Sequence, residues 1–202
     1  ERLDEIIGRV MSYAQLVYAG NMSSSENGKF YQSMQERSTE IGSDLLFFGL
    51  EINRIEETDL EGKLEATELA RYQPWLRDVR VFRPHQLSDE LEEMLHEKSV
   101  AGRGAWMRLF DETMAGLRFE LDGKELTAAE VLDRLSHKDG KEREAAARSL
   151  SKVLGANVKL FSLITNTLAK DKEVEDKRRQ YTRPISSRNR VNQVEDEVVD
   201  AL

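Results

Sequence analysis

The stretch IIGRVMSYAQLVYAGNMSSSENGKFYQSM, residues 6–34, decides the fold of this chain. Its first half repeats apolar residues every three or four positions, which is the period of an amphipathic α-helix. Small and polar residues at 20–25 interrupt the repeat, and the same period resumes after them. We therefore predict helices over about 1–18 and 26–55 that pack against each other as an antiparallel hairpin.

Helical patterns continue after this hairpin, in shorter pieces. Residues 59–83 predict two short helices that separate near 72–74. Ser88 is a typical N-terminal cap for the next helix, which we expect to end near Ser99. A further apolar stripe predicts a helix over about 102–117.

One pair of strands is predicted, near 117–127. Polar and apolar residues alternate on both sides of Asp122-Gly123, and this dipeptide suits the two positive-φ positions of a tight hairpin turn. Thr127 follows, with Glu130 three residues later, which is the spacing of a capping box. The strand pair should therefore lead directly into a helix that ends near His137.

The last third of the chain begins with another capping pattern, in which Asp139 is followed by Glu142. We predict a long helical region from there to about Arg179, kinked or broken near Gly155.

Residues 181–193 have no helical period and are predicted to be irregular. Residues 194–202 read as the start of an amphipathic helix that no stop signal follows. We interpret the chain as a piece of a longer protein, cut inside a helix. A frayed natural terminus is the alternative.

These patterns together predict a mainly α fold, a multi-helix bundle with antiparallel helical hairpins and one small β-hairpin near 117–127. We expect residues 1–118 to hold the N-terminal hairpin and the short helices that follow it. Residues 119–202 would then hold the β-hairpin, the long helices and the start of a connection to a further domain. One continuous helical domain is the alternative.

Composition excludes several classes of function. The 202 residues carry a net charge of −8, and bulk affinity for nucleic acid usually needs a basic face. No apolar run approaches the ~18 residues that a membrane helix needs, so we expect neither a nucleic-acid nor a membrane partner. The chain has no Cys, which excludes disulfides and thiolate chemistry and is compatible with a cytoplasmic location.

Motifs for catalysis are absent from the sequence. His96-Glu97 begins like the H-E-x-x-H motif of zinc peptidases, but Val100 stands where the second histidine would be. The sequence also contains no G-x-S-x-G elbow and no glycine-rich phosphate loop. We therefore predict no catalytic residue and no metal ligand in this chain.

The best candidate for a functional site is the segment Tyr181 to Gln193, because irregular stretches carry sites more often than helix faces do. Its arginines could hold a carboxylate by paired hydrogen bonds. The alternative is a connector whose arginines pair with acids elsewhere. The residues that we single out as candidate contacts are Tyr181, Arg183, Ser187, Arg188 and Asn189.

The sequence also resembles a known family over essentially its whole length. DKEVEDKRRQYTRPISSRNRVNQVEDEVVDAL, residues 171–202, is similar to the N-terminal region of the oligoendopeptidase F family of bacterial zinc metallopeptidases. The other similar blocks, in the same order, are RVMSYAQLVYAGNMSS (9–24), FRPHQLSDELEEMLHEKS (82–99), GRGAWMRLFDE (102–112) and LRFELDGKELTAAEVL (117–132).

The resemblance implies a parent enzyme that hydrolyses short peptides. In such a protein a helical N-terminal part precedes a catalytic part, which carries H-E-x-x-H and one zinc ion, and both parts enclose a substrate channel. This chain would be a wall of that channel, with the candidate contacts of 181–193 lining it, and would bind no zinc itself. Its partners would be its own C-terminal catalytic domain and short peptides.

Two other interpretations stay open. A freestanding helical scaffold or adaptor that binds a protein partner would end naturally at Leu202. A nucleic-acid binder would use the basic stretch 170–190, although acids are interspersed there. We also expect some self-association, because a chain separated from its catalytic part exposes an apolar face.

Overall fold

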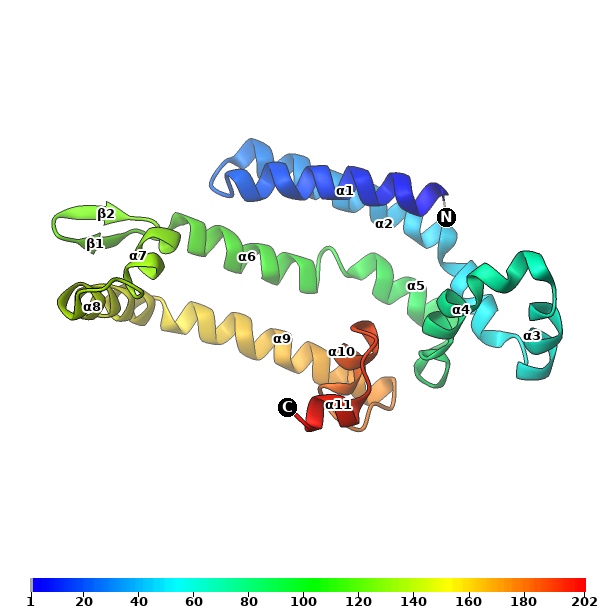
Figure 1. Cartoon of the computed structure of the whole chain (residues 1–202). Helices are drawn as coiled ribbons and strands as arrows, with labels where there is room; N and C mark the ends of the chain where they lie inside the picture. Colours follow the sequence, from blue (N-terminus) through cyan, green and yellow to red (C-terminus); the bar gives the residue numbers. More distant parts are fainter. Residues whose placement is uncertain (1) are drawn as a thin grey trace. The chain divides into compact units, whose positions relative to one another are not determined.

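The computed structural model describes residues 2–202, and these are mainly helical with one two-stranded antiparallel sheet, as predicted (Figure 1). None of the described helices is long and apolar enough to cross a bilayer. The elements are α1 (Arg2–Gly20), α2 (Ser25–Arg54), α3 (Glu57–Leu64), the 3₁₀ turn η1 (Thr67–Tyr72), α4 (Gln73–Arg80), the 3₁₀ turn η2 (Arg83–His85), α5 (Asp89–Lys98), α6 (Arg103–Gly116), β1 (Phe119–Leu121), β2 (Lys124–Leu126), α7 (Ala128–Arg134), α8 (Gly140–Ala156), α9 (Val158–Arg178), α10 (Ser186–Val191) and α11 (Asp196–Asp200).

The described residues form two compact units. One contains residues 2–38 and 100–169, and the other contains residues 39–99 and 170–202. Each unit combines segments that are distant in the sequence, whereas the expected border at residue 118 divides the chain once. That border stays a prediction about domains.

The first unit contains the turn of the predicted helical hairpin. Tyr18 of α1 stacks on Tyr31 of α2, with ring centroids 5.0 Å apart and an interplanar angle of 9°. The side chain of Asn27 donates hydrogen bonds to the carbonyl groups of Val17 and Asn21, which closes the turn between the helices. The break that the sequence places at 20–25 is therefore confirmed.

The small sheet packs on helices of the same unit. Phe119 of β1, Val131 of α7 and Ala146 of α8 are fully buried together. Asp122 and Gly123 have φ values of 52° and 73°, as a two-residue turn requires. The capping box predicted for the start of α7 is present: the Thr127 side chain accepts from the N–H of residue 130, and the side chain at 130 accepts from the N–H of Thr127.

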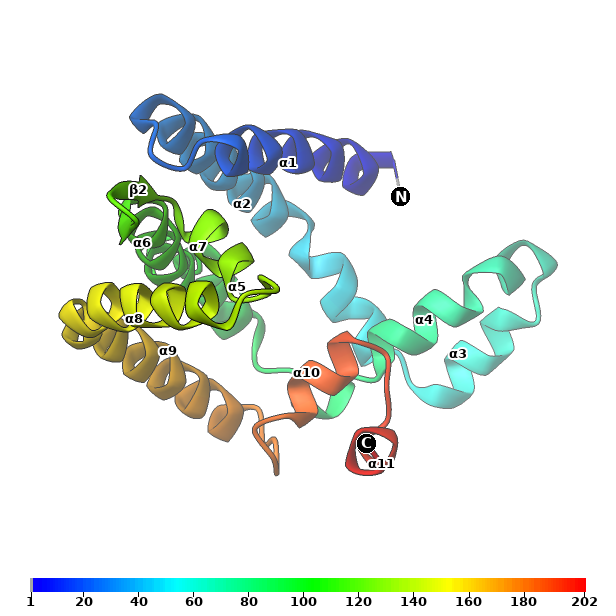
Figure 2. The ribbon, with the colours of Figure 1, turned by 60° about the vertical axis from the view of Figure 1, so that its left-hand side comes forward.

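The second unit has a small core of its own. Ile52 at the end of α2 packs with Leu60 of α3 and Leu76 of α4, and Arg80 donates a hydrogen bond from Nη1 to the carbonyl of Ile52 at 2.7 Å. Figure 2 shows α3 and α4 side by side. They correspond to the two predicted short helices, and the turn between them, η1, ends at Tyr72, where the split was predicted.

Three local predictions are wrong in detail. Ser88 stands at the N-cap of α5, but its side chain makes no capping hydrogen bond; instead Glu92 accepts from the N–H of Leu87. Asp139 caps α8 by accepting from the N–H of Lys141, without a capping box. The segment 181–193 is not irregular throughout, because it contains α10.

Candidate functional site

The candidate segment lies in the second unit and is bounded by two helix ends of the same geometry. At the end of α9, Gln180 has a φ of 59°, and the N–H of Tyr181 donates to the carbonyl of Asp176. At the end of α10, Gln193 has a φ of 55°, and the N–H of Val194 donates to the carbonyl of Asn189. Both are Schellman motifs, in which a residue in the left-handed region stops the helix. Gly is the residue most often found at that position, whereas this chain has Gln at both helix ends.

Tyr181 emerges from the first of these motifs and packs between two side chains. Its ring stacks on His85, with centroids 3.9 Å apart, and the guanidinium of Arg190 lies 5.5 Å from its centroid. His85 Nδ1 lies 2.7 Å from the carbonyl oxygen of Arg179, so Nδ1 carries the proton and donates. Tyr181 is therefore fixed in place by aromatic contacts and by the backbone next to it.

Arg179, next to the segment, forms a largely buried bidentate ion pair. Its two Nη atoms donate to both carboxylate oxygens of Glu92, at 2.6 and 2.8 Å, and the two side chains are only 17% and 12% exposed. Burial acts to raise the pKa of Glu92, but the hydrogen bonds from Arg179 and from the N–H of Leu87 outweigh it and lower the pKa. The pair fixes the end of α9 to the start of α5.

A second polar cluster closes the other end of the segment. Asp196, in the first turn of α11, accepts hydrogen bonds from Asn189 Nδ2 at 2.8 Å and from Ser186 Oγ at 2.7 Å. The hydrogen bond from Asn189 is the main cause that lowers the pKa of Asp196, and the hydrogen bond from Ser186 lowers it further. Ser186 and Asn189 are buried, and both side chains donate their hydrogen bonds to Asp196, so they serve to hold the segment in place.

Of the other three predicted residues, Arg183 and Arg188 are exposed and Ser187 is half-buried. Arg183 forms a bidentate pair with Asp200, at 2.6 and 2.8 Å, and Ser187 Oγ accepts from Lys172 Nζ at 2.9 Å. Arg188 is exposed, and no side-chain hydrogen bond or ion pair joins it to any other of residues 2–202. The structure thus brings the five candidates onto one short helix and its flanks, and only Arg188 offers an uncommitted cation.

The sequence reasoning missed the residues that hold this segment in place. His85, Glu92 and Asp196 come from three different places in the chain, and no spacing rule connects them to Arg179 or Asn189. Neither Glu92 nor His85 belongs to a motif that the sequence shows. The only available signal was the density of polar residues in 181–193.

Metal binding depends on which His, Asp and Glu side chains come together in the described residues. Within residues 2–202, no group of three or more His, Asp or Glu side chains could hold a metal ion. The zinc ion implied by the family resemblance therefore has no fitting ligands in this part of the chain. The exposed guanidinium of Arg188 is the group of the segment that can orient a polar chain by charge-assisted hydrogen bonds.

Comparisons with known proteins point to one family. A family model described as Oligopeptidase F matches residues 51–119. A search of curated proteins finds no match. Two solved structures share the fold. One is the oligoendopeptidase-F from Enterococcus faecium, with a TM-score of 0.85, 20% identity and 98% of this chain covered. The other is a putative peptidase from Chlamydophila abortus, with a TM-score of 0.63, 15% identity and 99% covered.

The chain spans 41% of the length of the first of these structures and 35% of the second. The predicted resemblance to the N-terminal region of the oligoendopeptidase F family is confirmed by the family match and the shared fold.

Proposed function

We propose that this chain is the N-terminal helical part of a zinc-dependent oligoendopeptidase that hydrolyses short peptides. The observation that carries the proposal is the fold, which matches an oligoendopeptidase-F over 98% of this chain but only 41% of that enzyme. The remaining part would hold the zinc ion and the catalytic groups. We place the protein in the cytoplasm, as the resemblance implies, and assign this chain no catalysis of its own.

Within that enzyme, the chain would form part of the wall of the substrate channel, and the segment 181–193 would contact the peptide. Arg188 is the residue best suited to do so, because its guanidinium is exposed and uncommitted. Tyr181, Arg183 and Ser187 flank it, and the buried Asn189 supports it through Asp196. A peptide offers carbonyl oxygens and a terminal carboxylate, which are acceptors for such a donor.

The first test is the coding sequence after Leu202, read for about 250 codons. The proposal requires H-E-x-x-H with a further Glu downstream; a continuation without that motif would overturn it. The second test is Arg188→Ala in the continuous protein, measured with fluorogenic peptides. Loss of one charge-assisted hydrogen bond should lower kcat/KM about tenfold. Arg148→Ala, on the exposed face of α8, is the matched control and should change nothing.

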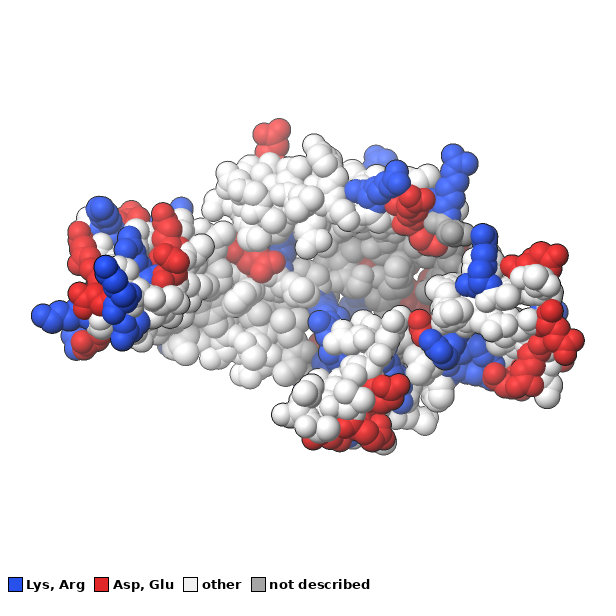
Figure 3. Space-filling view, viewed as in Figure 1, with Lys and Arg blue, Asp and Glu red and all other residues white. Residues whose placement is uncertain are grey.

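One observation favours the second candidate, a helical scaffold that binds a protein partner. α1 buries Ala14 and Tyr18 inside the unit. It also exposes a row of apolar residues three or four positions apart, the spacing by which helices pair in coiled coils. The surface of α1 is largely uncharged toward its C-terminal end, whereas charged side chains lie toward its N-terminal end (Figure 3). The exposed residues are Leu3, Ile6, Val10, Tyr13 and Leu16.

Such a stripe also leads us to propose that the isolated chain self-associates. Size-exclusion chromatography with light scattering would measure this. Leu16→Lys, at the most exposed apolar position of the stripe, should shift the chain toward the monomer. A monomer at every concentration of the unmodified chain would count against self-association.

A further inference from the structure

A polar cleft of about 340 Å³ opens in the second unit, at the end of α2, and the candidate segment takes no part in it. Its walls come from the last turn of α2 and from the segment around η2. The cleft is lined by Asn53, Arg54, Glu56, Arg83, Gln86 and Leu87.

Two of the lining side chains are amides with an unmet acceptor. Asn53 is only 8% exposed, and its Oδ1 is buried without a hydrogen-bond donor from any of residues 2–202. Gln86 Oε1, from the opposite wall, is in the same situation. Buried polar atoms in proteins are almost always hydrogen-bonded, so two orphaned acceptors beside one cleft require an explanation. A ligand that donates N–H groups would provide it, once each terminal amide turns its oxygen toward the cleft.

Two arginines line the same cleft, and each is held by ion pairs that are partly exposed. Arg83 reaches Glu56 at 3.2 Å and Glu57 at 3.8 Å, and its side chain is 34% exposed. Arg54 pairs with Asp89, and both side chains are about half exposed. Ion pairs this exposed are weak, so an incoming carboxylate can displace or share them.

Arg80, which lies near the cleft, is not available to a ligand. The Arg80 side chain is only 8% exposed and is committed to the Ile52 carbonyl and to Glu57. Arg80 serves the core, whereas Arg54 and Arg83 are accessible from the cleft.

We propose that this cleft binds the carboxyl-terminal end of a peptide chain. The α-carboxylate would be held by Arg83 and Arg54, and the N–H groups next to it would donate to the amide oxygens of Asn53 and Gln86. A free amino acid offers the same carboxylate beside an N–H donor, so it is the second source of this chemistry. The site stands on the chemistry of the cleft itself and does not depend on the channel role proposed for 181–193.

The test uses the 202-residue chain and two probes, N-acetyl-Ala-Ala with a free carboxylate and the same compound as its amide. Binding is measured by NMR chemical-shift changes of the backbone amides. The acid should bind with shifts confined to residues around 53–56 and 83–87, and the amide should bind at least about tenfold more weakly, because it lacks the charge that the arginines hold. Free alanine as a third probe distinguishes the two sources of the carboxylate.

Two variants make the assignment specific. Arg83→Met should weaken binding of the acid about tenfold, whereas Arg148→Met, an exposed arginine on α8, should not alter it. Asn53→Leu removes a buried amide without changing its size much, so it should weaken binding while the thermal midpoint stays the same or rises. If Asn53→Leu keeps its stability but loses binding, Asn53 contacts the ligand and does not merely support the fold.

Equal binding of the acid and the amide, or shifts outside the cleft, would overturn the proposal, as would no binding by the folded chain. Because every measurement uses this chain alone, such a failure leaves the proposed peptidase role untouched. Conversely, a missing catalytic motif after Leu202 would not affect a positive result here.

Discussion

Arg179 and Glu92 lie 87 residues apart in the sequence and form a bidentate ion pair, with Nη–Oε distances of 2.6 and 2.8 Å. Arg179 follows the last residue of α9, and Glu92 lies in the first turn of α5. The two side chains are largely buried, and Arg179 also donates to Glu175 and to the carbonyl of His85. The pair therefore connects the two sequence segments that build the second unit.

Breaking this pair should destabilise the second unit. Glu92→Gln removes the more buried of the two carboxylates that pair with Arg179 and leaves only Glu175, and the expected cost is about 2 kcal/mol, between the values for exposed and fully buried pairs. Urea denaturation, followed by circular dichroism, measures it. Glu93→Gln, one residue along on the exposed face of α5, is the control and should cost less than about 0.5 kcal/mol. Equal effects of the two substitutions would mean that the pair is unimportant.

The same pair predicts how stability depends on pH. The pKa of Glu92 in the folded chain lies below its ordinary value of 4.5, so the unfolded chain takes up the proton first. The stabilising effect is therefore complete above pH 4.5 and is lost as the pH falls through the lower pKa of the folded state. The difference in urea midpoint between the unmodified chain and Glu92→Gln should shrink from pH 7 to pH 3. A constant difference would contradict the lowered pKa.

Sequence patterns predicted the helices and the β-hairpin because these depend on neighbours close in the chain. The capping box at Thr127 and the turn at Asp122-Gly123 involve residues at most three positions apart, and both are confirmed. The pair between Arg179 and Glu92 could not be predicted, because a charged helix residue shows no preference for one distant partner over another. Its contact depends on how two helix ends meet in space.

The predicted end of the long helical region near Arg179 agrees with the end of α9, but the short helix α10 inside the candidate segment was missed, for a different reason. Both Gln180 and Gln193 adopt positive φ, which costs a non-Gly residue roughly 1–2 kcal/mol. Sequence rules expect Gly or Asn there, so the segment 181–193 looked irregular where it holds a short helix between two Schellman motifs.

Gln180→Gly should therefore stabilise the chain. Gly occupies the left-handed region without steric cost, and the gain should be about 1 kcal/mol after its greater entropy in the unfolded chain is subtracted. Gln180 is exposed and its side chain makes no hydrogen bond to another of residues 2–202, so no contact is lost. Gln180→Ala keeps a Cβ and should show no gain. Thermal unfolding compares the three proteins, and a loss with Gly would mean that the left-handed conformation is not maintained in solution.

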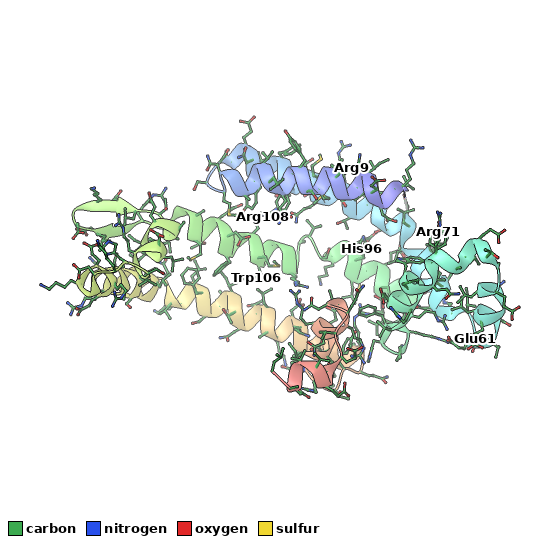
Figure 4. All side chains as sticks on the ribbon, in the orientation of Figure 1. Arg9, Glu61, Arg71, His96, Trp106 and Arg108 are labelled. Carbon is green, nitrogen blue, oxygen red and sulfur yellow. The ribbon has the colours of Figure 1, made fainter. Side chains whose placement is uncertain are left out.

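Replacing a glycine of α2 should instead destabilise the chain. A Cβ placed on Gly42 would lie 2.6 Å from Nε2 of His96, which projects from α5 (Figure 4) and bonds to the Thr39 carbonyl at 3.1 Å. Replacing Gly by Ala inside a helix normally stabilises it by about 0.5–1 kcal/mol. At Gly42 the substitution must displace the imidazole and its hydrogen bond, so a net loss of about 1–2 kcal/mol is expected.

Two comparisons isolate the cause of this loss. Gly49 lies on the same helix, and a Cβ there meets no atom within 4 Å, so Gly49→Ala should stabilise by the ordinary helix increment. In a His96→Ala background the clash at Gly42 disappears, and Gly42→Ala should then become stabilising as well. The double-mutant cycle, measured by urea denaturation, should give a coupling energy above about 1 kcal/mol. Additive effects would show that α2 and α5 do not approach each other through this imidazole.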